Sequence, residues 1–387
     1  MGPLAGVRVL DLSRVLAGPW ASQLLADLGA DVVKVEAPGR GDDTRHWGPP
    51  ELVTGEAAYF HAANRGKRSI ALDLARDRDT LLALVDCADV VIENFKVGGL
   101  ARFGLDYPSL KARRPELIYC SITGFGQDGP WAQRPGYDLL IQGLGGLMSI
   151  TGQPDGVPGG GPVKVGVALV DILTGLYATI GIQAALRHRE RTGEGQQIDL
   201  ALLDVSVAVL ANQAMNYLAT GQAPGRLGNG HPNIVPYDVY PTSDGHLILA
   251  VGNDGQFAAL AALLGAPGWA QDPDFATNAA RVRQRHRLNA LIAERLLARS
   301  SADWSAMLEA AGVPGGPILT LDTLFALEQG AVRGWVQQVQ RGEQSLPTLA
   351  NPLHLSATPV CYGRASPALD GDRDSVLRDW LGQSRLL

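Results

Sequence analysis

Residues 7–36, VRVLDLSRVLAGPWASQLLADLGADVVKVE, decide the fold class, because they contain two apolar strand patterns on either side of a helical pattern. The strands are predicted at 7–12 and 31–36. Pro19 is expected in the first turn of the helix between them, where its missing N–H group costs no hydrogen bond, and Gly29 ends that helix. A strand, a helix and a second strand in this order predict a parallel βαβ unit.

The same alternation continues after this unit. Three more strand-like runs are predicted at 69–74, 90–93 and 117–122, and a helical pattern at 80–85 separates two of them. Short apolar strands joined by helices indicate a parallel sheet covered on both faces. We therefore expect an α/β fold with a Rossmann-like large domain. Ligands of such sheets bind beyond the carboxyl ends of the strands, which this sequence places at residues 13–19, 94–95 and 123–127.

The second half of the chain predicts a smaller α+β domain. Two strand patterns, 237–240 and 246–251, flank Asp244-Gly245 as in a hairpin. A helix is predicted from about 202 to 218, and further helical patterns lie at 257–264, 282–297 and 305–311. We expect a large domain at residues 1–205 plus 335–387, a linker at 206–224, the small domain at 225–325 and a second linker at 326–334.

The composition of the 387 residues argues against several classes of protein. Lys+Arg 33 and Asp+Glu 39 give 33 − 39 = −6, and an acidic chain is not expected to bind nucleic acid through its phosphates. Cys87, Cys120 and Cys361 are far apart and form no CxxC pair, so neither a disulfide scaffold nor a thiolate zinc site is expected. With no signal peptide before the first strand, we expect a cytoplasmic protein.

Residues 165–186 form an apolar run that is long enough to cross a bilayer. They carry one charge, Asp171, which costs about 3 kcal/mol in lipid. Small or polar residues also interrupt the apolar surface: Thr174, Gly175, Gly181 and Gln183. We expect a buried helix with no membrane partner, and Asp171 as a buried acid.

The familiar catalytic motifs are absent from the sequence. The turn after the first strand has one glycine, Gly18, whereas a dinucleotide site needs G-x-G-x-x-G. Neither a G-x-S-x-G nucleophile elbow nor a G-x-x-x-x-G-K-[ST] phosphate loop occurs. The seven histidines never pair with one another at i, i+4 or with acids at ligand spacing, so no metal site is expected.

Carboxylate chemistry remains as the candidate. Gly136-Tyr137-Asp138 follows the glycine-rich strand end at 124–126, and Asp138 stands directly before an apolar helix. From spacing alone, an N-cap is the commoner role of such an aspartate. A carboxylate at a binding cleft is the other interpretation. The two are compatible, because backbone N–H groups hold anions at helix N-termini.

A set of motifs along the chain points to one family. The N-terminal motifs are Val9–Pro19, Leu28–Glu36 and Gly41–Arg45, and later ones are Asn64–Ile70, Val91–Phe95, Ser121–Gly126 and Thr192–Gln196. Together they resemble the family III CoA-transferases of the CaiB/BaiF type, which include formyl-CoA transferase, carnitine CoA-transferase and the α-methylacyl-CoA racemases. The matches run from near residue 4 to about 320. Residues 41–50, 234–237 and 312–318 most resemble the succinate–hydroxymethylglutarate (dicarboxylate) CoA-transferases.

The resemblance implies an activity and an assembly. The enzyme would move CoA from an acyl-CoA such as succinyl-CoA to a short dicarboxylic acid, with no prosthetic group. Asp138 matches the family's nucleophile, which forms an aspartyl anhydride and then an aspartyl-CoA thioester. Gly228 and Gly230 match the glycine loop that covers the activated aspartate, although Asn229 interrupts the glycine run. The family also implies an interlocked homodimer, whose interface would bury the helix predicted at 165–186.

The resemblance places CoA on the large domain, position by position. Val15, Leu16 and Ala17 match the wall of the adenine and ribose site. The nucleotide-contacting positions match Leu72, Asn94, Phe95 and Arg102. The pantetheine channel matches Thr123, Gly124 and Phe125. Three positions depart from the pattern: Ala37 and Ala75 stand where the formyl-CoA enzyme has cations, and Thr123 replaces a lysine. The phosphates would then need other cations, for which Arg14, Lys96 and Arg40 are candidates.

Two alternatives stay open from the sequence. An α-methylacyl-CoA racemase needs a histidine beside the family aspartate and a second acid, but Tyr137 occupies the histidine position. Asp171 matches the second acid, which transferases also have. A CoA-binding protein without turnover is the other alternative. For the second carboxylate of a dicarboxylate, the basic candidates are Arg45, His46 and His231.

Overall fold

The computed structural model describes residues 2–382. It divides into two compact units. The first consists of Met1–Gly146, Val165–Leu210 and Glu328–Leu387, and the second of Leu147–Lys164 and Ala211–Leu327.

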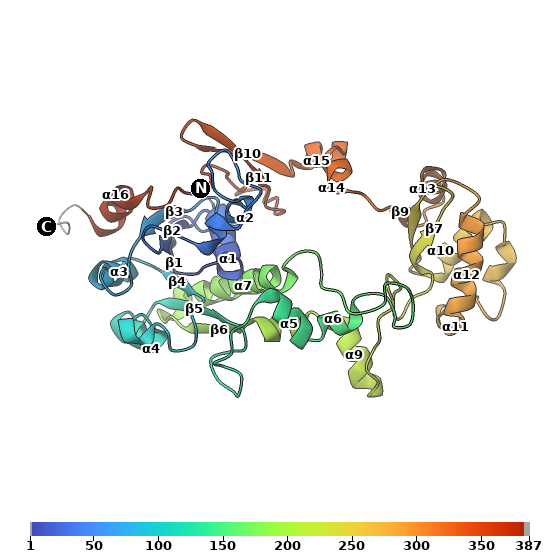
Figure 1. Ribbon diagram of the computed structural model, residues 1–387, viewed down its shortest axis with the longest axis horizontal. Helices are drawn as coiled ribbons and strands as arrows, with labels where there is room; N and C mark the ends of the chain where they lie inside the picture. The colour runs from blue at the N-terminus through green and yellow to red at the C-terminus, as the bar shows by residue number, and fades with distance from the viewer. Residues whose placement is uncertain (1, 383–387) are drawn as a thin grey trace. The chain divides into compact units, whose positions relative to one another are not determined.

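A six-stranded parallel sheet forms the centre of the first unit (Figure 1). Its order is β3 (Arg68–Ala71), β2 (Asp31–Glu36), β1 (Arg8–Asp11), β4 (Val90–Glu93), β5 (Ile118–Thr123) and β6 (Gln197–Ala201). In the register of the central strands, Val9 pairs with Val32 on one side and with Val90 on the other. The strand order changes direction between β1 and β4: the chain adds strands on one side of β1 up to β3 and on the other side from β4 onward. Ligands of open α/β sheets bind in the crevice at such a switch point. The predicted parallel α/β sheet is confirmed.

Helices cover both faces of this sheet. One apolar core lies under α1 (Ala17–Asp27), α5 (Asp138–Leu144), α7 (Leu169–Thr192) and α8 (Leu202–Ala208). The core on the other face lies under α3 (Arg78–Val85), α4 (Tyr107–Arg113), α16 (Arg373–Val376) and the π-helix η4 (Leu377–Leu381). Strands β1 to β5 are buried along nearly their whole length because both faces are covered, whereas the edge strand β6 is only partly buried.

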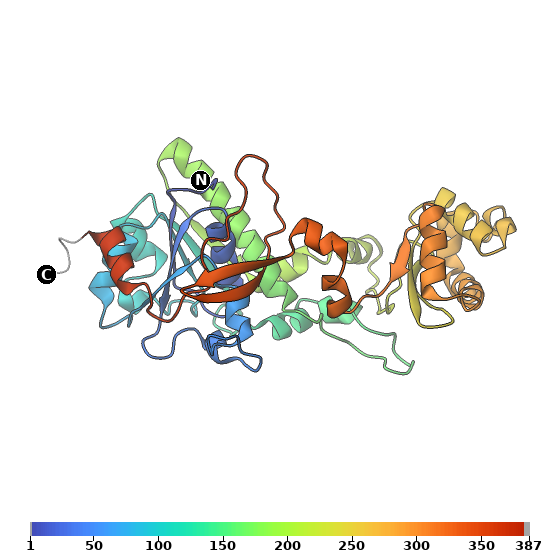
Figure 2. The same ribbon diagram turned by 90° about the horizontal axis from the view of Figure 1, so that it is seen from above.

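Shorter elements complete the first unit. They are the 3-10 helices η1 (Asp43–His46) and η2 (Ala101–Phe103), the helices α2 (Ala58–Ala62) and α15 (Glu328–Arg333), and the hairpin strands β10 (Val336–Arg341) and β11 (Gln344–Leu349). The hairpin lies near α2, as Figures 1 and 2 show, and Arg341 pairs with Glu56 at 2.6 Å just before that helix. The C-terminal residues thus pack against the N-terminal part of the first unit.

The second unit is a small α+β domain. The antiparallel strands β7 (Tyr237–Pro241), β8 (His246–Ala250) and β9 (Gly315–Pro317) form its sheet. Leu247, Phe257 and Ile292 belong to its core. Its helices are α6 (Leu147–Ile150), α9 (Ala211–Thr220), α10 (Asp254–Leu263), η3 (Pro267–Ala270), α11 (Asn278–Arg283), α12 (Arg285–Leu296), α13 (Ser301–Ala310) and α14 (Leu321–Phe325).

The unit boundaries differ from the predicted domain limits in two places. Residues 147–164, which the sequence assigns to the large domain, belong to the second unit. The reason is a set of contacts with the loop before β7: the Gly228 N–H donates to the Gly152 carbonyl at 3.0 Å, and the Arg226 Nε donates to the Gln153 carbonyl at 3.1 Å. The helix predicted at 202–218 is also wrong as one element. It breaks between α8 and α9, where Ala211 adopts a positive φ of 45°.

The apolar helix α7 passes a length and composition test for a membrane span. It is nevertheless a partly buried core helix: Val170, Ala178 and Ile182 are fully buried, and a side chain at Gly175 would meet the Ala17 carbonyl oxygen at 2.8 Å. The protein is a soluble one. Residues on the other side of α7 are exposed, with Ile180 at 61%.

Candidate active site

The loops that follow β1 and β4 meet at the reversal point of the sheet. The Arg14 N–H donates to the Asn94 side-chain oxygen at 2.9 Å, and the Asn94 amide donates back to the Arg14 carbonyl at 2.7 Å. Val15 has φ = 71°, a conformation that is strained for a β-branched residue. Its N–H is directed at the Asp42 carboxylate, with both oxygens at 3.3 Å. The strained turn is thus fixed from two neighbouring loops.

Buried ion pairs form the floor beneath this turn. The Lys34 ammonium pairs with Asp42 at 2.8 Å and donates to the Ser13 carbonyl at 2.9 Å. Burial by itself would raise the pKa of Asp42, but the Lys34 charge and the Thr44 hydrogen bonds outweigh it and lower that pKa to about 2. Lys67 lies beside Asp11 at 3.2 Å, and burial lowers its pKa to about 8. Asp42 therefore stays ionised at neutral pH as the acceptor that faces Val15.

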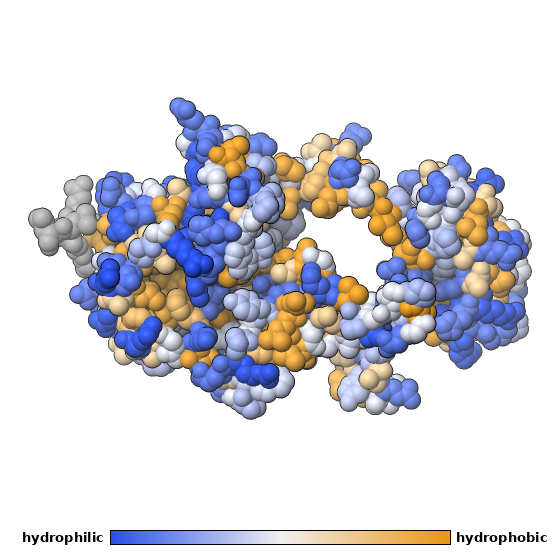
Figure 3. Space-filling model, viewed as in Figure 1, coloured by the Kyte–Doolittle hydropathy of each residue, from blue (hydrophilic) through white to orange (hydrophobic). Residues whose placement is uncertain are grey.

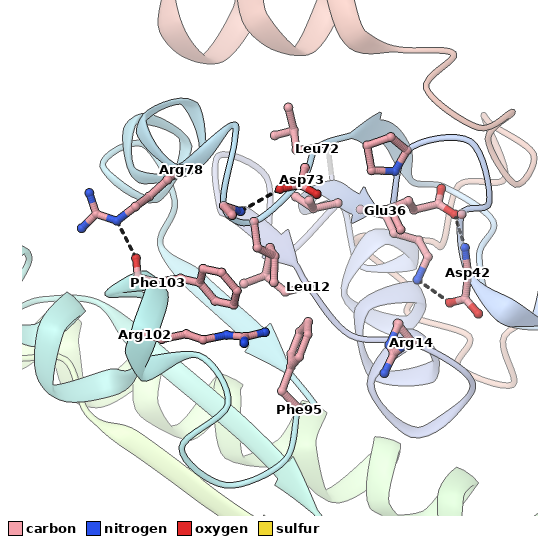
Figure 4. A pocket seen from close by; sticks show the side chains of 17 residues that line it. Leu12, Arg14, Glu36, Asp42, Leu72, Asp73, Arg78, Phe95, Arg102 and Phe103 are labelled. Atoms are coloured by element: carbon pink, nitrogen blue, oxygen red, sulfur yellow. Dashed lines mark hydrogen bonds and ion pairs between the residues drawn. The ribbon is translucent and has the colours of Figure 1, made fainter.

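A cavity of about 690 Å³ opens at the ends of β1, β2 and β4 (Figure 4). The predicted nucleotide residues Leu72, Phe95 and Arg102 line it, and Figure 4 shows the Arg102 side chain extending toward Phe95. Ala37 and Ala75 line it as well. The cavity wall therefore has no cation at positions 37 and 75, where the formyl-CoA enzyme has cations.

Three arginines of the first cavity supply positive charge instead. Arg14 lines it, as predicted, and Arg102 stacks over the Phe103 ring at 4.5 Å. Arg78 was not expected from the sequence. Its Nε donates to the Phe103 carbonyl at 2.7 Å, and its Nη1 lies 3.8 Å from the exposed Asp79 carboxylate. Arg40 does not line the cavity and pairs with Asp43 at 3.1 Å on the surface.

A second cavity, of about 190 Å³, adjoins the same loops. Its lining includes seven of the predicted CoA-binding residues: Val15, Leu16, Ala17, Asn94, Phe95, Thr123 and Gly124. Phe95 lines both cavities, so the two cavities adjoin at this residue. Lys96, Arg134, Tyr137 and Asp171 also belong to this lining. Phe125 lines neither cavity, because its ring packs against Trp131 with centroids 5.5 Å apart.

Two glycines position the loop before Asp138, which contributes Gly136 and Tyr137 to the lining of this cavity, whereas Asp138 itself does not line it. A Cβ on Gly136 would lie 2.5 Å from the Gly124 Cα, and one on Gly124 would lie 2.8 Å from the Gly136 Cα. Such distances are too short for any side chain, so the loop before α5 touches the end of β5 through backbone alone. Asp138 then begins α5, and Tyr137 is the N-cap residue.

The Asp138 carboxylate caps a different helix from its own. Its Oδ1 accepts the N–H groups of Val170 at 2.8 Å and Asp171 at 3.2 Å, in the first turn of α7. Its Oδ2 accepts the side-chain amide of the buried Gln142 at 2.6 Å. The simple N-cap interpretation of Asp138 for α5 is therefore wrong. The N-terminus of a 24-residue helix holds the carboxylate.

A second acid and a phenol lie close to Asp138. Burial and the Asp138 charge raise the pKa of Asp171 to about 7. Burial, and then the charges of Asp171, Asp138 and Asp42, raise the pKa of Tyr59 above its ordinary value of 10.0. The Tyr59 phenol therefore stays neutral over the physiological range.

The comparisons with known proteins agree with this geometry. The family model described as "CoA-transferase family III" matches residues 4–373. The chain belongs to CoA-transferase family III. It is 53% identical over 385 residues to the succinate–glutarate CoA-transferase of Agrobacterium fabrum, with 97% of this chain and 95% of that protein covered. It is 40% identical to the human succinyl-CoA:glutarate CoA-transferase, with 98% and 86% covered.

A solved structure shows the same fold. A crystal structure of a CaiB/BaiF family protein from Brucella suis has a TM-score of 0.86 and 52% identity to this chain, with 98% of this chain and 99% of that one covered. The chain is thus a CoA-transferase, and an acyl-CoA is a substrate, as the sequence predicts.

Other predicted residues of this CoA-transferase are not part of the lining of the two cavities. Gly228 and Gly230 belong to the second unit, where the Gly228 N–H donates to Gly152 and the Gly230 N–H donates to the Leu227 carbonyl, each at 3.0 Å. Arg45, a candidate for substrate carboxylate binding, is buried and pairs with Glu36 at 2.7 Å and with Glu56. That arginine is therefore already paired on both sides. His46 Nε2 lies 2.9 Å from the Arg40 carbonyl oxygen, and His231 belongs to the second unit.

Among residues 2–382, no group of three or more His, Cys, Asp or Glu side chains is arranged to hold a metal ion.

Proposed function

We propose that this CoA-transferase moves CoA from succinyl-CoA to glutarate or a similar short dicarboxylate, through covalent intermediates on Asp138. The substrates named in the two relatives above support this choice of donor and acceptor. The observation that carries the proposal is the Asp138 carboxylate at the N-terminus of α7, beside the second cavity.

The two cavities suit the two ends of CoA. The adenine nucleotide would occupy the larger one, against Leu72 and Phe95, with its phosphates near Arg14, Arg78 and Arg102. Guanidinium groups bind phosphate through charge-assisted hydrogen bonds. The pantetheine arm would pass Asn94 and Phe95 along the walls formed by Val15 to Ala17, Thr123 and Gly124, toward Asp138. Phe125 would support this wall without contacting the ligand, through its packing on Trp131.

The chemistry on Asp138 divides one transfer into two exchanges. An Asp138 carboxylate oxygen attacks the acyl carbon, the C–S bond breaks, and the electron pair leaves on the CoA sulfur. The thiolate then attacks the Asp138 Cγ, the anhydride bond to that carbon breaks, and succinate leaves. The acceptor carboxylate reverses these steps: it displaces the thiolate from Asp138, and the thiolate then attacks the acceptor acyl carbon.

The hydrogen bonds of Asp138 assign roles to its two oxygens. Oδ1 has two backbone donors, whereas Oδ2 has one side-chain donor, Gln142. Oδ2 is therefore the better nucleophile, and Oδ1 becomes the carbonyl oxygen of the intermediates. When the thiolate attacks Cγ, negative charge develops on Oδ1, and the N–H groups of Val170 and Asp171 stabilise it. One donor of this kind contributes roughly 10²- to 10³-fold in rate.

The assembly and the glycine loop complete the proposal. Exposed apolar side chains on α5, namely Leu139, Leu140 and Leu144, support burial in a homodimer, and Figure 3 shows apolar residues at the surface in this region. Gly228 and Gly230 would cover the acylated Asp138 after their present hydrogen bonds open. A cytoplasmic location suits a chain with three free cysteines.

Replacement of Asp138 tests the proposed nucleophile. Asp138→Asn is expected to lose transferase activity by more than about 10³-fold, since the covalent route closes. A match for this variant is Asp303→Asn, whose side chain is exposed on α13. Full activity of Asp138→Asn in an assay of glutaryl-CoA formation would refute the proposal.

A further inference from the structure

Asp171 is a buried acid that the covalent steps above leave without a role. It lines the second cavity together with Thr123 and Gly124, where the thiol end of CoA would arrive. Its own N–H lies 3.2 Å from Asp138 Oδ1, so the two carboxyl groups are neighbours at the start of α7. Burial and the charge of Asp138 are the two causes of its raised pKa.

Formation of the anhydride removes the negative charge of Asp138 and at the same time produces a base nearby, the CoA thiolate. In the resting enzyme the charge of Asp138 helps to keep Asp171 protonated, since its pKa is about 7. Formation of the anhydride neutralises Asp138 and places the negative charge on the CoA sulfur. One of the two causes of the raised pKa of Asp171 is then gone, so Asp171 becomes a stronger acid beside a thiolate.

We propose that the Asp171 carboxyl group donates its proton to the CoA sulfur as the thioester breaks, and takes it back before the sulfur attacks Asp138. This proposal rests on the proposed function, because it requires charge to leave Asp138.

The proton and the electrons balance over the exchange. Asp138 Oδ2 forms the bond to the acyl carbon, the C–S electron pair goes to sulfur, and the proton of Asp171 follows to give CoA-SH and an Asp171 carboxylate. In the second step Asp171 recovers the proton, the thiolate bonds to Cγ of Asp138, and the acyl carboxylate leaves. No proton is gained or lost overall, and no other reactant is needed.

Other titratable groups do not substitute for Asp171. Asp138 on α5 and Tyr59 on α2 are coupled to it electrostatically. The other charged and titratable groups in the lining of the second cavity are Arg14, Lys96, Arg134 and Tyr137. Asp138 is the nucleophile, and the pKa of Tyr59 is raised by burial and by both aspartates. Asp171 is thus the acid nearest neutrality among these groups. General acid catalysis by a positioned group contributes roughly 10²- to 10⁴-fold.

The first half-reaction tests this role in isolation. Succinyl-CoA is mixed with excess enzyme without acceptor, and formation of the Asp138 adduct is timed by rapid quench and mass spectrometry between about pH 5.5 and 9. In the wild type the rate is expected to fall as pH rises through about 7, because Asp171 loses its proton. Asp171→Asn is expected to be about 10²-fold slower with no such fall, and Asp171→Glu to recover a fall with pH.

The possible outcomes separate the two proposals. An Asp171→Asn rate equal to that of the wild type, or an unchanged fall with pH in that variant, would overturn the role of Asp171 while the Asp138 adduct persists. Absence of the adduct in the wild type would instead overturn the proposed function.

A second measurement covers the case in which Asp171→Asn does not fold. Carboxyl ¹³C NMR of wild type and Asp138→Asn would follow the titration of Asp171, whose pKa is expected to fall when the neighbouring charge is removed. An unchanged pKa in Asp138→Asn would also overturn the role.

Discussion

Two neighbouring aspartates of this CoA-transferase have different surroundings. Asp138 accepts three hydrogen bonds, two of them from the first turn of α7. Burial and the charge of Asp138 raise the pKa of Asp171 to about 7. Asp171 is therefore an acid that titrates near neutrality beside the carboxylate that we propose as the nucleophile.

At the residue scale, Arg102→Met tests the placement of the CoA phosphates. A charge-assisted hydrogen bond contributes about 1.5–3 kcal/mol, so the KM for succinyl-CoA is expected to rise roughly 10- to 100-fold with kcat nearly unchanged. Lys111→Met on α4 serves as the control, since Lys111 does not line the cavity. Steady-state kinetics with an unchanged KM in Arg102→Met would exclude contact between Arg102 and CoA.

The sequence predicted several residues of the site, and long-range contacts explain the others. Asn94 and Gly124 lie just beyond predicted strands, and the carboxyl ends of parallel strands share one edge of the sheet, so their convergence on the second cavity was predictable. Arg78 was missed because the helical pattern was placed to begin at residue 80, whereas α3 begins at Arg78 itself. Asp138 caps α7 through the N–H groups of Val170 and Asp171, which lie 32 and 33 positions later in the sequence, so no local sequence pattern shows this contact.

Elements, rather than single side chains, hold Asp138 in place. The contact of Gly136 with Gly124 joins the loop before α5 to β5, and Gln142 connects α5 to the Val165 N–H at 2.9 Å. Together these contacts place α5 against the start of α7. The break between α8 and α9 at Ala211 was not predictable from periodicity, because the apolar pattern continues through it.

A methyl group at Gly136 is expected to displace Asp138. Its Cβ would lie 2.5 Å from the Gly124 Cα, so the loop has to move, and a shift of about 1 Å lowers catalytic rates by roughly 10²-fold. Gly136→Ala should therefore lose kcat far more than thermal stability. Gly268→Ala, at a position with open space around it, is the control. Wild-type kcat in Gly136→Ala would contradict this role of the glycine contact.

Acid stability is expected to depend on the ion pair between β2 and the loop that follows it. The pKa of Asp42 is about 2 in the folded chain against an ordinary value of 3.8. A lowered pKa of an acid stabilises the fold above the ordinary value, and this stabilisation is lost as pH falls through about 2. Asp42 should contribute about 2 kcal/mol in this way. In urea unfolding between about pH 5 and 2, the free energy of unfolding should fall less steeply with decreasing pH in Asp42→Asn than in the wild type. An equal dependence on pH in both proteins would contradict this expectation.

At the scale of the whole molecule, exposed apolar side chains on the first unit require an explanation. Ile180 and Tyr177 on α7 and Leu139 on α5 are exposed at 61%, 43% and 55%, although charged residues usually occupy such positions. The proposed homodimer would cover them. Membership of the family was predictable from motifs spread over most of the chain, whereas the two-unit boundaries depend on contacts such as Gly228 with Gly152.

Light scattering tests this assembly. The wild type is expected to have the mass of two chains, and Ile180→Asp to shift toward one chain, because a buried charge without a partner opposes association. Ser109→Asp on α4 provides an exposed control. A wild type with the mass of one chain would contradict the homodimer.

The covalent route through Asp138 can be followed most directly with oxygen-18 in both carboxylates of glutarate. In this route the acceptor oxygen that bonds to Asp138 Cγ stays there when the thiolate attacks the glutaryl carbon. After turnover with succinyl-CoA, the peptide that contains Asp138 should therefore gain about 2 Da for each oxygen transferred, as mass spectrometry would show. Glutaryl-CoA formation with no label on that peptide would mean direct transfer between substrates and would contradict the account.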